Sequence, residues 1–214
     1  MNGAESLLET LVACGVDTCF ANPGTSEMHF VAALDKQEGM RSVLGLFEGV
    51  VTGAADGYAR MAGKPACTLL HLGPGLANGL ANLHNARRAR VPLVNVVGEH
   101  ATYHRHLDAP LTSDINGFAS PVSGWIRAPE TADQVAQAGA EAVAAACRPP
   151  GQIATLILPA DTAWNEASGA ASPIAPDRPN APSDEAITAA AHALRSGESC
   201  ALLMNGAALS EAGL

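Results

Sequence analysis

Glu48 is the residue of this sequence best suited to acid–base chemistry. It stands between Leu46-Phe47 and Val50-Val51, so that a charged side chain is placed among apolar neighbours at the predicted start of a helix. Desolvation there favours the neutral form of a carboxyl, which suits proton exchange with a bound base. The alternative is that a glutamate in a first helical turn only complements the helix dipole. The residue type alone leaves both interpretations open.

Other polar residues and glycines stand directly after short apolar runs, where strands are expected to end. In an open parallel sheet, ligands bind at the carboxyl ends of the strands, where loops lead into helices. Functional groups on such loops are held by a rigid scaffold. Four segments have this character, namely 22–26 (NPGTS), 47–49 (FEG), 71–75 (HLGPG) together with Asn78, and 98–100 (GEH).

The elements that must position these residues alternate along the chain. Apolar residues with helical spacing are followed by short apolar runs that end in turn signals. This alternation predicts an α/β fold with an open, doubly wound parallel sheet flanked by helices. The predicted helices are 6–12, 26–35, 48–61, 76–89 and 131–147, and the predicted strands are 17–21, 42–46, 66–72, 92–97 and 153–158.

The composition divides the chain into three parts. Residues 1–165 are predicted to form one α/β domain, and residues 166–184 are rich in Ser, Pro and Ala and read as a linker. Residues 185–214 are predicted to begin a central α/β domain, with a helix over 185–195 and a strand over 201–204. One helix and one strand cannot bury a core, so we expect this second domain to be incomplete.

The runs FANPGTSE, GLFEGVVTGAADGYARMAGKPA and LLHLGPGLANGLANLHNARRARVPLVNVVGE occur in this order over about the first 160 residues. This ordered set resembles the N-terminal, pyrimidine-binding domain of thiamine-diphosphate-dependent enzymes such as acetolactate synthase and benzoylformate decarboxylase. The resemblance implies that Glu48 hydrogen-bonds the aminopyrimidine ring of the cofactor and promotes its imino tautomer. That tautomer removes a proton from the thiazolium carbon, which then attacks a 2-oxo acid.

The resemblance also carries roles to further positions. Pro23 and Gly24 match the family's turn against the cofactor, and Gly75 and Asn78 lie in the loop and helix that contact it. Thr25 and His71 stand where benzoylformate decarboxylase has an active-site serine and histidine, so both are candidate substrate contacts. Because Gly73-Pro74-Gly75 resembles the acetolactate synthase version of its loop, decarboxylation and carboligation, as a lyase or a transferase, both stay open.

The family's second signature, Gly-Asp-Gly followed by Asn-Asn, is absent from these 214 residues. In the family that signature binds Mg²⁺ and the diphosphate in a C-terminal domain. The resemblance therefore implies thiamine diphosphate and Mg²⁺ as cofactors, with Mg²⁺ bound outside this chain and no metal ligand within it. We expect the fragment alone to be inactive and the complete enzyme to be a homodimer or homotetramer. Whether FAD is also bound stays open.

Three features of the sequence suggest other functions. Gly73 and Gly75 after a strand imitate a dinucleotide-binding fingerprint, but the third glycine, Gly79, falls one position late. His100, His104 and His106 lie close in sequence, but no carboxylate or cysteine completes a set of metal ligands. A pyrimidine-domain relative without its other domains could also be a non-catalytic binding or assembly module. The gene sequence beyond residue 214 would discriminate this module from the enzyme, because a continuing frame with the Gly-Asp-Gly and Asn-Asn signature supports the enzyme.

The composition narrows the partners and the compartment. The 12 Lys and Arg against 21 Asp and Glu give a net charge of −9, which disfavours nucleic acid as a partner. Five cysteines without CxxC spacing indicate neither a disulfide framework nor a zinc site. Neither a signal peptide nor a membrane segment is predicted, because the N-terminus is acidic and polar residues interrupt the uncharged run 65–86. We therefore expect a cytoplasmic protein that acts on a small 2-oxo acid.

Overall fold

The structure is a computed structural model that describes residues 1–177 and 179–209. Contacts divide the chain into two compact units, Met1–Asp177 and Arg178–Leu214. The first unit contains a sheet of six parallel strands in the order β2-β1-β3-β4-β6-β5. The predicted doubly wound α/β fold is therefore confirmed. The strands are β1 Thr18–Asn22, β2 Arg41–Leu44, β3 Ala66–Leu70, β4 Leu93–Glu99, β5 Trp125–Arg127 and β6 Ile153–Pro159.

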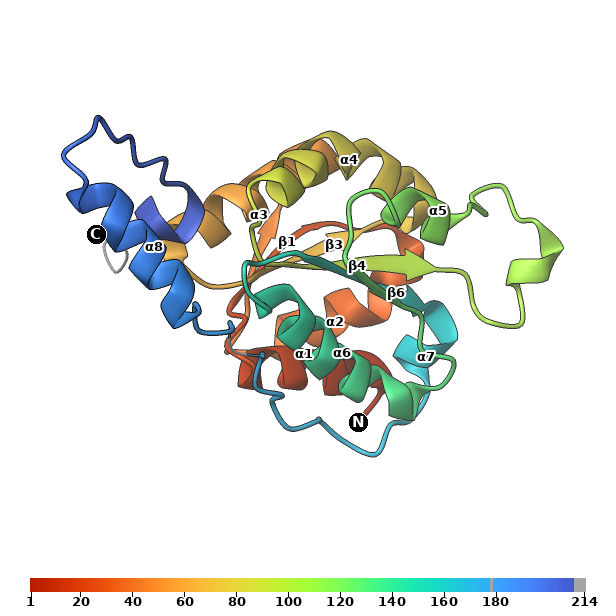
Figure 1. The fold of residues 1–214 in the computed structure, drawn as a ribbon. Helices are drawn as coiled ribbons and strands as arrows, with labels where there is room; N and C mark the ends of the chain where they lie inside the picture. The colour runs from red at the N-terminus through yellow and green to blue at the C-terminus, as the bar shows by residue number, and fades with distance from the viewer. Residues whose placement is uncertain (178, 210–214) are drawn as a thin grey trace. The chain divides into compact units, whose positions relative to one another are not determined.

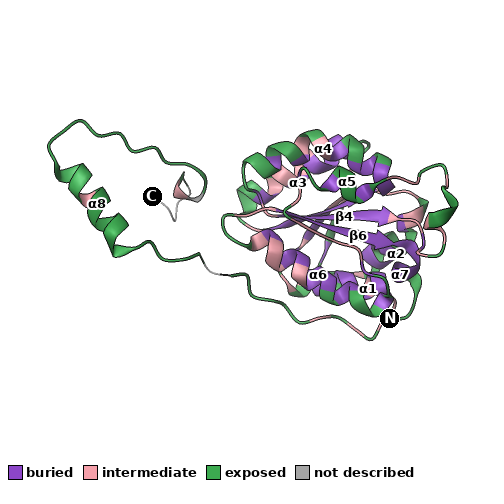
Figure 2. Cartoon of the chain, turned by 45° about the vertical axis from the view of Figure 1, so that its right-hand side comes forward, coloured by how far each residue is buried: buried purple, intermediate pink, exposed green. Residues whose placement is uncertain are grey.

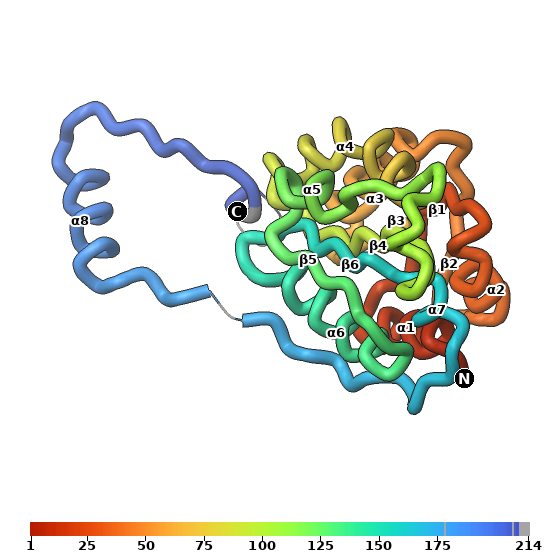
Figure 3. Tube along the Cα trace, turned by 90° about the vertical axis from the view of Figure 1, so that its right-hand side faces the viewer, coloured from red at the N-terminus to blue at the C-terminus, as the bar shows by residue number. Residues whose placement is uncertain are grey.

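Helices cover both faces of the sheet (Figure 1). One face carries α1 (Gly3–Ala13), α2 (Met28–Lys36), α6 (Ala132–Cys147) and α7 (Ala160–Trp164), and the other carries α3 (Glu48–Ala62), α4 (Leu72–Arg88) and α5 (Ile115–Ala119). Two hydrophobic clusters result, one between the sheet and each helical layer. Figure 2 shows the central strands buried between these layers, and Figure 3 shows the layers along the sheet from another side.

A row of polar side chains crosses the middle of the sheet. Thr68, Asn95 and Thr155 are in register on β3, β4 and β6, and all three are fully buried. Thr68 Oγ1 donates to Asn95 Oδ1 at 2.7 Å, and Asn95 Nδ2 donates to Thr155 Oγ1 at 3.1 Å. Buried polar groups need such partners because an unpaired one costs its full desolvation free energy. The row thus couples three neighbouring strands through their side chains as well as their backbones.

The strand order creates a topological switch point between β1 and β3. The chain leaves β1 through α2 on one face of the sheet, whereas it leaves β3 through α4 on the opposite face. Two connections that diverge in this way leave a crevice at the carboxyl ends of their strands, and ligands of open α/β sheets bind there. The segments that follow Asn22 and Leu70 are therefore the expected position of a ligand site.

An ion pair ties the end of α3 to the start of β1. Asp17 accepts hydrogen bonds from the Lys64 ammonium and, at 2.7 Å, from the Tyr58 hydroxyl. These bonds, that of Lys64 above all, lower the pKa of Asp17 to about 2. The far end of α3 is thus held to the amino end of the strand that precedes the switch point.

The structure corrects the predicted start of α4. The sequence pattern assigned Gly73-Pro74-Gly75 to a loop before a helix beginning at Leu76, whereas α4 begins at Leu72 and includes all three residues. Proline is tolerated in a first helical turn because the N–H groups there have no partner within the helix. Gly75 N–H donates to His71 C=O at 2.8 Å, so helical bonding already starts from His71.

Other differences concern short or weakly patterned segments. The helix α1 begins before its predicted start at Ser6, because Asn2 and Glu5 form a capping box with bonds of 2.9 and 3.0 Å. The sequence reasoning missed α5, β5 and α7, which have only three to five residues each. None of the helices in the described residues is long and apolar enough to cross a membrane.

The second unit contains one helix of notable length, α8 (Asp184–Arg195), which Ser183 caps by accepting from Ala186 N–H at 3.2 Å. This helix agrees with the one predicted over 185–195. The predicted strand over 201–204 is not formed, and these residues are exposed without regular structure. A strand needs neighbours to satisfy its backbone groups, and the described part of this unit offers none. The predicted domain boundaries themselves stay a prediction.

Candidate functional site

Glu48 lies at the first position of α3, and its side chain is buried with only 8% of the residue exposed. Asn78 Nδ2, in the second turn of α4, donates to Glu48 Oε2 at 3.0 Å. Two further hydrogen bonds between α3 and α4 fix the position of Asn78 along the helix relative to Glu48. Asn82 Nδ2 donates to Gly49 C=O at 2.6 Å, and Thr52 Oγ1 donates to Gly79 C=O at 3.2 Å. The predicted pair Glu48 and Asn78 is thus brought together by helix packing.

One oxygen of the Glu48 carboxylate accepts a hydrogen bond that orients the group, and the other oxygen is available to a ligand. Oε2 is occupied by Asn78, whereas Oε1 has no hydrogen-bond partner among the described residues and is not completely buried. A Cβ at Gly75 would lie 3.2 Å from this Oε1 and 3.4 Å from His71 Cβ. Gly75 therefore separates Glu48 from His71 by little more than its own backbone. A side chain there would fill the space beside the carboxylate.

His71 and Glu27 form a second group, at the switch point between β1 and β3. Glu27 lies in the 3₁₀ turn η1 (Thr25–Glu27) that follows β1, and His71 follows β3. His71 Nδ1 lies 2.8 Å from Glu27 Oε2, and the same oxygen accepts from Gly24 N–H at 2.7 Å. The His71 ring packs so closely against Gly24 that a methyl group at this position would overlap it. The predicted residues Gly24 and His71 thus meet through Glu27.

The sequence reasoning missed Glu27 as a site residue. It is part of the run FANPGTSE, three residues after Gly24, and this spacing resembles the capping pattern of an ordinary helix start. Nothing in the local pattern indicates that the side chain is fully buried against a histidine 44 residues away. A glutamate that follows a turn and precedes the buried Phe30 by three residues was the only available signal.

Thr25 lines a cavity whose lining residues do not include Glu48, Asn78 or His71. Together with His29, His100, His104 and Trp164, it surrounds this cavity of about 340 Å³. The loop that carries His100 and His104 is anchored because Asp161 accepts from Thr102 N–H at 2.9 Å and from its hydroxyl. Pro23, the remaining predicted residue, is half-buried between β1 and η1.

The histidines of this region do not assemble a metal site. The rings of His100 and His104 lie 5.5 Å apart, centroid to centroid, at an angle of 57°. Across residues 1–177 and 179–209, no three His, Cys, Asp or Glu side chains come together in a way that could hold a metal ion. Besides its histidines, the cavity beside Thr25 is lined by hydroxyl, aromatic and apolar side chains, namely Ser26, Met28, Ala101, Tyr103, Ala160 and Trp164.

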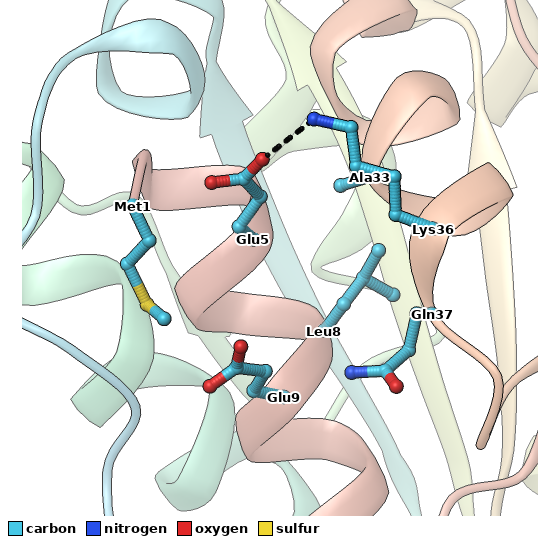
Figure 4. Close-up of a pocket in the computed structure, with 7 residues that line it drawn as sticks. All are labelled: Met1, Glu5, Leu8, Glu9, Ala33, Lys36 and Gln37. Atoms are coloured by element: carbon cyan, nitrogen blue, oxygen red, sulfur yellow. Dashed lines mark hydrogen bonds and ion pairs between the residues drawn. The ribbon is translucent and has the colours of Figure 1, made fainter.

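A second cavity, of about 230 Å³, lies between α1 and α2 (Figure 4). At its edge Lys36 Nζ lies 3.1 Å from Glu5 Oε1. The bond that Glu5 accepts from Asn2 N–H, followed by that from Lys36, lowers the pKa of Glu5. None of the residues that line this cavity belongs to the predicted site.

Known proteins that resemble this chain come from one family. Residues 1–121 match the model of the family "Thiamine pyrophosphate enzyme, N-terminal TPP binding domain". A provisionally named acetolactate synthase large subunit, IlvX of Mycobacterium tuberculosis, is 61% identical over 214 residues, which cover 100% of this chain and 41% of that protein. Benzoylformate decarboxylase of Pseudomonas aeruginosa is 36% identical over 154 residues, covering 72% of this chain and 29% of the relative.

Solved structures lead to the same family. A thiamine diphosphate-dependent 4-hydroxybenzoylformate decarboxylase of Rhodococcus jostii RHA1 superimposes with a TM-score of 0.81 at 27% identity, covering 92% of this chain and 38% of that one. This chain spans about two fifths of the length of the relative IlvX, which is 41% covered. The matched family model covers 121 of the 214 residues, more than half of the chain. The chain therefore belongs to the thiamine pyrophosphate enzymes and carries their N-terminal TPP binding domain.

Proposed function

We propose that this chain supplies Glu48 as the cofactor-activating carboxylate of an enzyme that decarboxylates or ligates a 2-oxo acid. The observation that carries this proposal is the buried Glu48 side chain, with one oxygen held by Asn78 and the other available beside Gly75. Relatives named for acetolactate synthesis and for benzoylformate decarboxylation support a 2-oxo acid as substrate. Both reaction types, and hence a transferase or a lyase, are part of the proposal.

The residues present fit the aminopyrimidine end of thiamine diphosphate. The chemistry supplied by the bound cofactor is addition to a ketone carbon and stabilisation of the electron pair left after loss of CO₂. Glu48 Oε1 would hold or share a proton with a ring nitrogen, and Asn78 would keep the carboxylate in the orientation that this bond needs. A Cβ at Gly75 would lie 3.2 Å from Oε1, so the glycine keeps a side chain away from this oxygen.

The substrate would be contacted by His71 and Thr25. His71 is 23% exposed at its side chain, so its ring can reach a bound molecule while Glu27 holds its other side. Thr25 contributes a hydroxyl to the aromatic cavity near His100. Pro23 and Gly24, which join β1 to the turn that begins at Thr25, would contact the cofactor. A cytoplasmic location is also part of the proposal, as expected from the composition.

We predict that the 214-residue chain binds thiamine diphosphate weakly, with a dissociation constant above about 1 μM. We assign the diphosphate and its Mg²⁺ to groups outside these residues, and charge-assisted bonds to phosphate are the strong ones. Calorimetric titration in the presence of Mg²⁺ measures this constant, with thiamine as the matched ligand that lacks the diphosphate. Thiamine and thiamine diphosphate should bind about equally. Submicromolar binding of thiamine diphosphate, together with weak binding of thiamine, would contradict the assignment of the diphosphate site to groups outside these residues.

We further propose that the enzyme is a homodimer or homotetramer that covers the surface around Glu48. Leu46 is 91% exposed and Val50 is 60% exposed, and both flank the buried Glu48. Adjacent exposed apolar side chains of this kind are typical of interaction surfaces. We predict that Leu46→Asp weakens self-association of the complete enzyme at micromolar concentration, as measured by sedimentation. Wild-type enzyme that sediments as a monomer at that concentration would refute the proposal.

A further inference from the structure

The pair Glu27 and His71 has properties that the cofactor-binding role does not explain. The Glu27 side chain is 0% exposed, and it lies at the carboxyl ends of the strands that flank the switch point. Burying a carboxylate is costly unless it is paired and hydrogen-bonded. Among the described residues, His71 is the one basic group within ion-pair distance of Glu27. The contact with His71 therefore offsets part of the cost of burying this carboxylate.

Helix capping explains only part of this arrangement. Glu27 Oε2 accepts from Gly24 N–H, as a capping glutamate does, but Oε1 is buried without a hydrogen-bond partner in the described chain. Oε1 packs against Gly98 of β4, where any side chain would overlap it. Glu5 offers the comparison, because it caps α1 by accepting from Asn2 N–H at 3.0 Å while its side chain stays 27% exposed. Capping alone requires no burial.

The contact determines which nitrogen of the His71 ring carries the proton. A carboxylate can only accept, so the ring must donate from Nδ1, which lies 2.8 Å from Oε2. In the neutral ring the lone pair is then on Nε2. The ring also packs against Gly24, and its side chain is 23% exposed. Nε2 has no hydrogen-bond partner among the described residues, so it is the nitrogen available to a ligand.

We propose that Glu27 is a positioning residue that holds His71 with Nδ1–H bonded and Nε2 available for proton exchange with the bound substrate. In that exchange Nε2 takes up a proton from water, and the Nε2–H bond of the resulting imidazolium breaks as an O–H bond forms at the ketone oxygen of the 2-oxo acid. The oxygen gains the electron pair of the C=O π bond when the ketone carbon is attacked, and the nitrogen keeps the electron pair of the N–H bond. The Glu27 carboxylate faces the positive charge of the imidazolium, as the carboxylate of a catalytic triad does. The return of the proton reverses these steps. This inference rests on the proposed function, since the substrate is the one proposed above.

The tautomer of His71 tests the first half of the proposal without any activity measurement. Nitrogen NMR of the imidazole rings in the 214-residue chain distinguishes Nδ1–H from Nε2–H, and a His71→Gln variant assigns the signals. We expect wild-type His71 to be the Nδ1–H tautomer. Gly24 N–H donates to the same oxygen as Nδ1, so a glutamine would keep its carbonyl oxygen there, and the informative variant is Glu27→Ala, which removes the acceptor. In Glu27→Ala the Nε2–H tautomer should become more populated, because Nδ1–H has lost its partner. A wild-type ring in the Nε2–H form, or a tautomer unchanged by Glu27→Ala, would overturn the proposal.

The matched control is Glu5→Ala, which removes a capping carboxylate that has no histidine partner. It should leave the His71 signals unchanged. If Glu27 served only as a cap, Glu27→Ala would also leave the tautomer unchanged. Should Glu27→Ala fail to fold, the wild-type spectrum still tests the proposal, because an Nε2–H tautomer there overturns it.

A double-mutant cycle in the complete enzyme tests the second half. We expect Glu27→Gln to lower turnover by about 10- to 10³-fold, within the range for acid–base groups and the carboxylates that orient them. The same substitution should have almost no effect in the His71→Gln background, because Glu27 acts through His71. Equal effects in both backgrounds would refute the positioning role. Failure of the proposed function would be recognised separately, by a Glu48→Gln variant that turns over normally while His71 keeps the Nδ1–H tautomer.

Discussion

Replacing Glu48 by glutamine should slow turnover of the complete enzyme by about 10²- to 10⁴-fold, the usual contribution of a general acid–base group. Glutamine keeps the size of the side chain and can still pair with Asn78, but it cannot exchange a proton with the cofactor ring. Folding should be almost unaffected, because the buried carboxyl is replaced by an isosteric amide that leaves no cavity. Exchange of the thiazolium proton of the bound cofactor and the thermal midpoint of the same variant measure the two quantities.

A helix-dipole role for Glu48 predicts the opposite pattern. Loss of a negative charge in a first helical turn would cost about 0.3–1 kcal/mol of stability and leave proton exchange unchanged. Asp133 is a suitable control, since it lies in the first turn of α6, in the same unit as Glu48, and is exposed. Asp133→Asn should reproduce only the dipole effect, because asparagine can still accept the hydrogen bonds from Ser168. Near-normal proton exchange in Glu48→Gln, together with a lowered midpoint, would show that Glu48 is a helix-capping charge and not a catalytic group.

Replacing Asn95 by alanine should destabilise the chain by about 2–4 kcal/mol, through lost hydrogen bonds and a new cavity. The change leaves the Thr68 hydroxyl without its acceptor and removes the bond to Thr155 in a part of the sheet with no exposure. Thr155 keeps its contact of 2.7 Å with Ser123, so it loses less than Thr68 does. Unfolding by urea, followed by circular dichroism, measures the loss.

The control for this prediction is Asn85→Ala on α4. Asn85 is exposed, and its amide oxygen has one weak contact, 3.4 Å from His84 Nδ1. Exposed substitutions of this kind usually change stability by less than about 0.5 kcal/mol. If Asn95→Ala were as mild as Asn85→Ala, the polar row across β3, β4 and β6 would have no structural importance.

The amino-acid sequence alone determined the fold class and the family. Apolar runs that alternate with helical periods are local patterns, and a parallel α/β sheet follows from them because such strands must be covered on both faces. The motifs around Glu48 and Gly75 predicted the family, because each motif is a contiguous run of residues. Short elements such as β5 were not predictable, because three half-buried residues at a sheet edge carry almost no periodic signal.

Only the tertiary structure decided which site residues meet. The bond of Asn78 to Glu48 depends on the packing of α4 against α3, and the contact of His71 with Glu27 depends on β3 pairing directly with β1. Both contacts join residues at least 30 positions apart, so no local pattern contains them. Glu27 in particular has the spacing of a common helix cap. Its complete burial against His71 arises because the strand order places the ends of β1, β3 and β4 side by side.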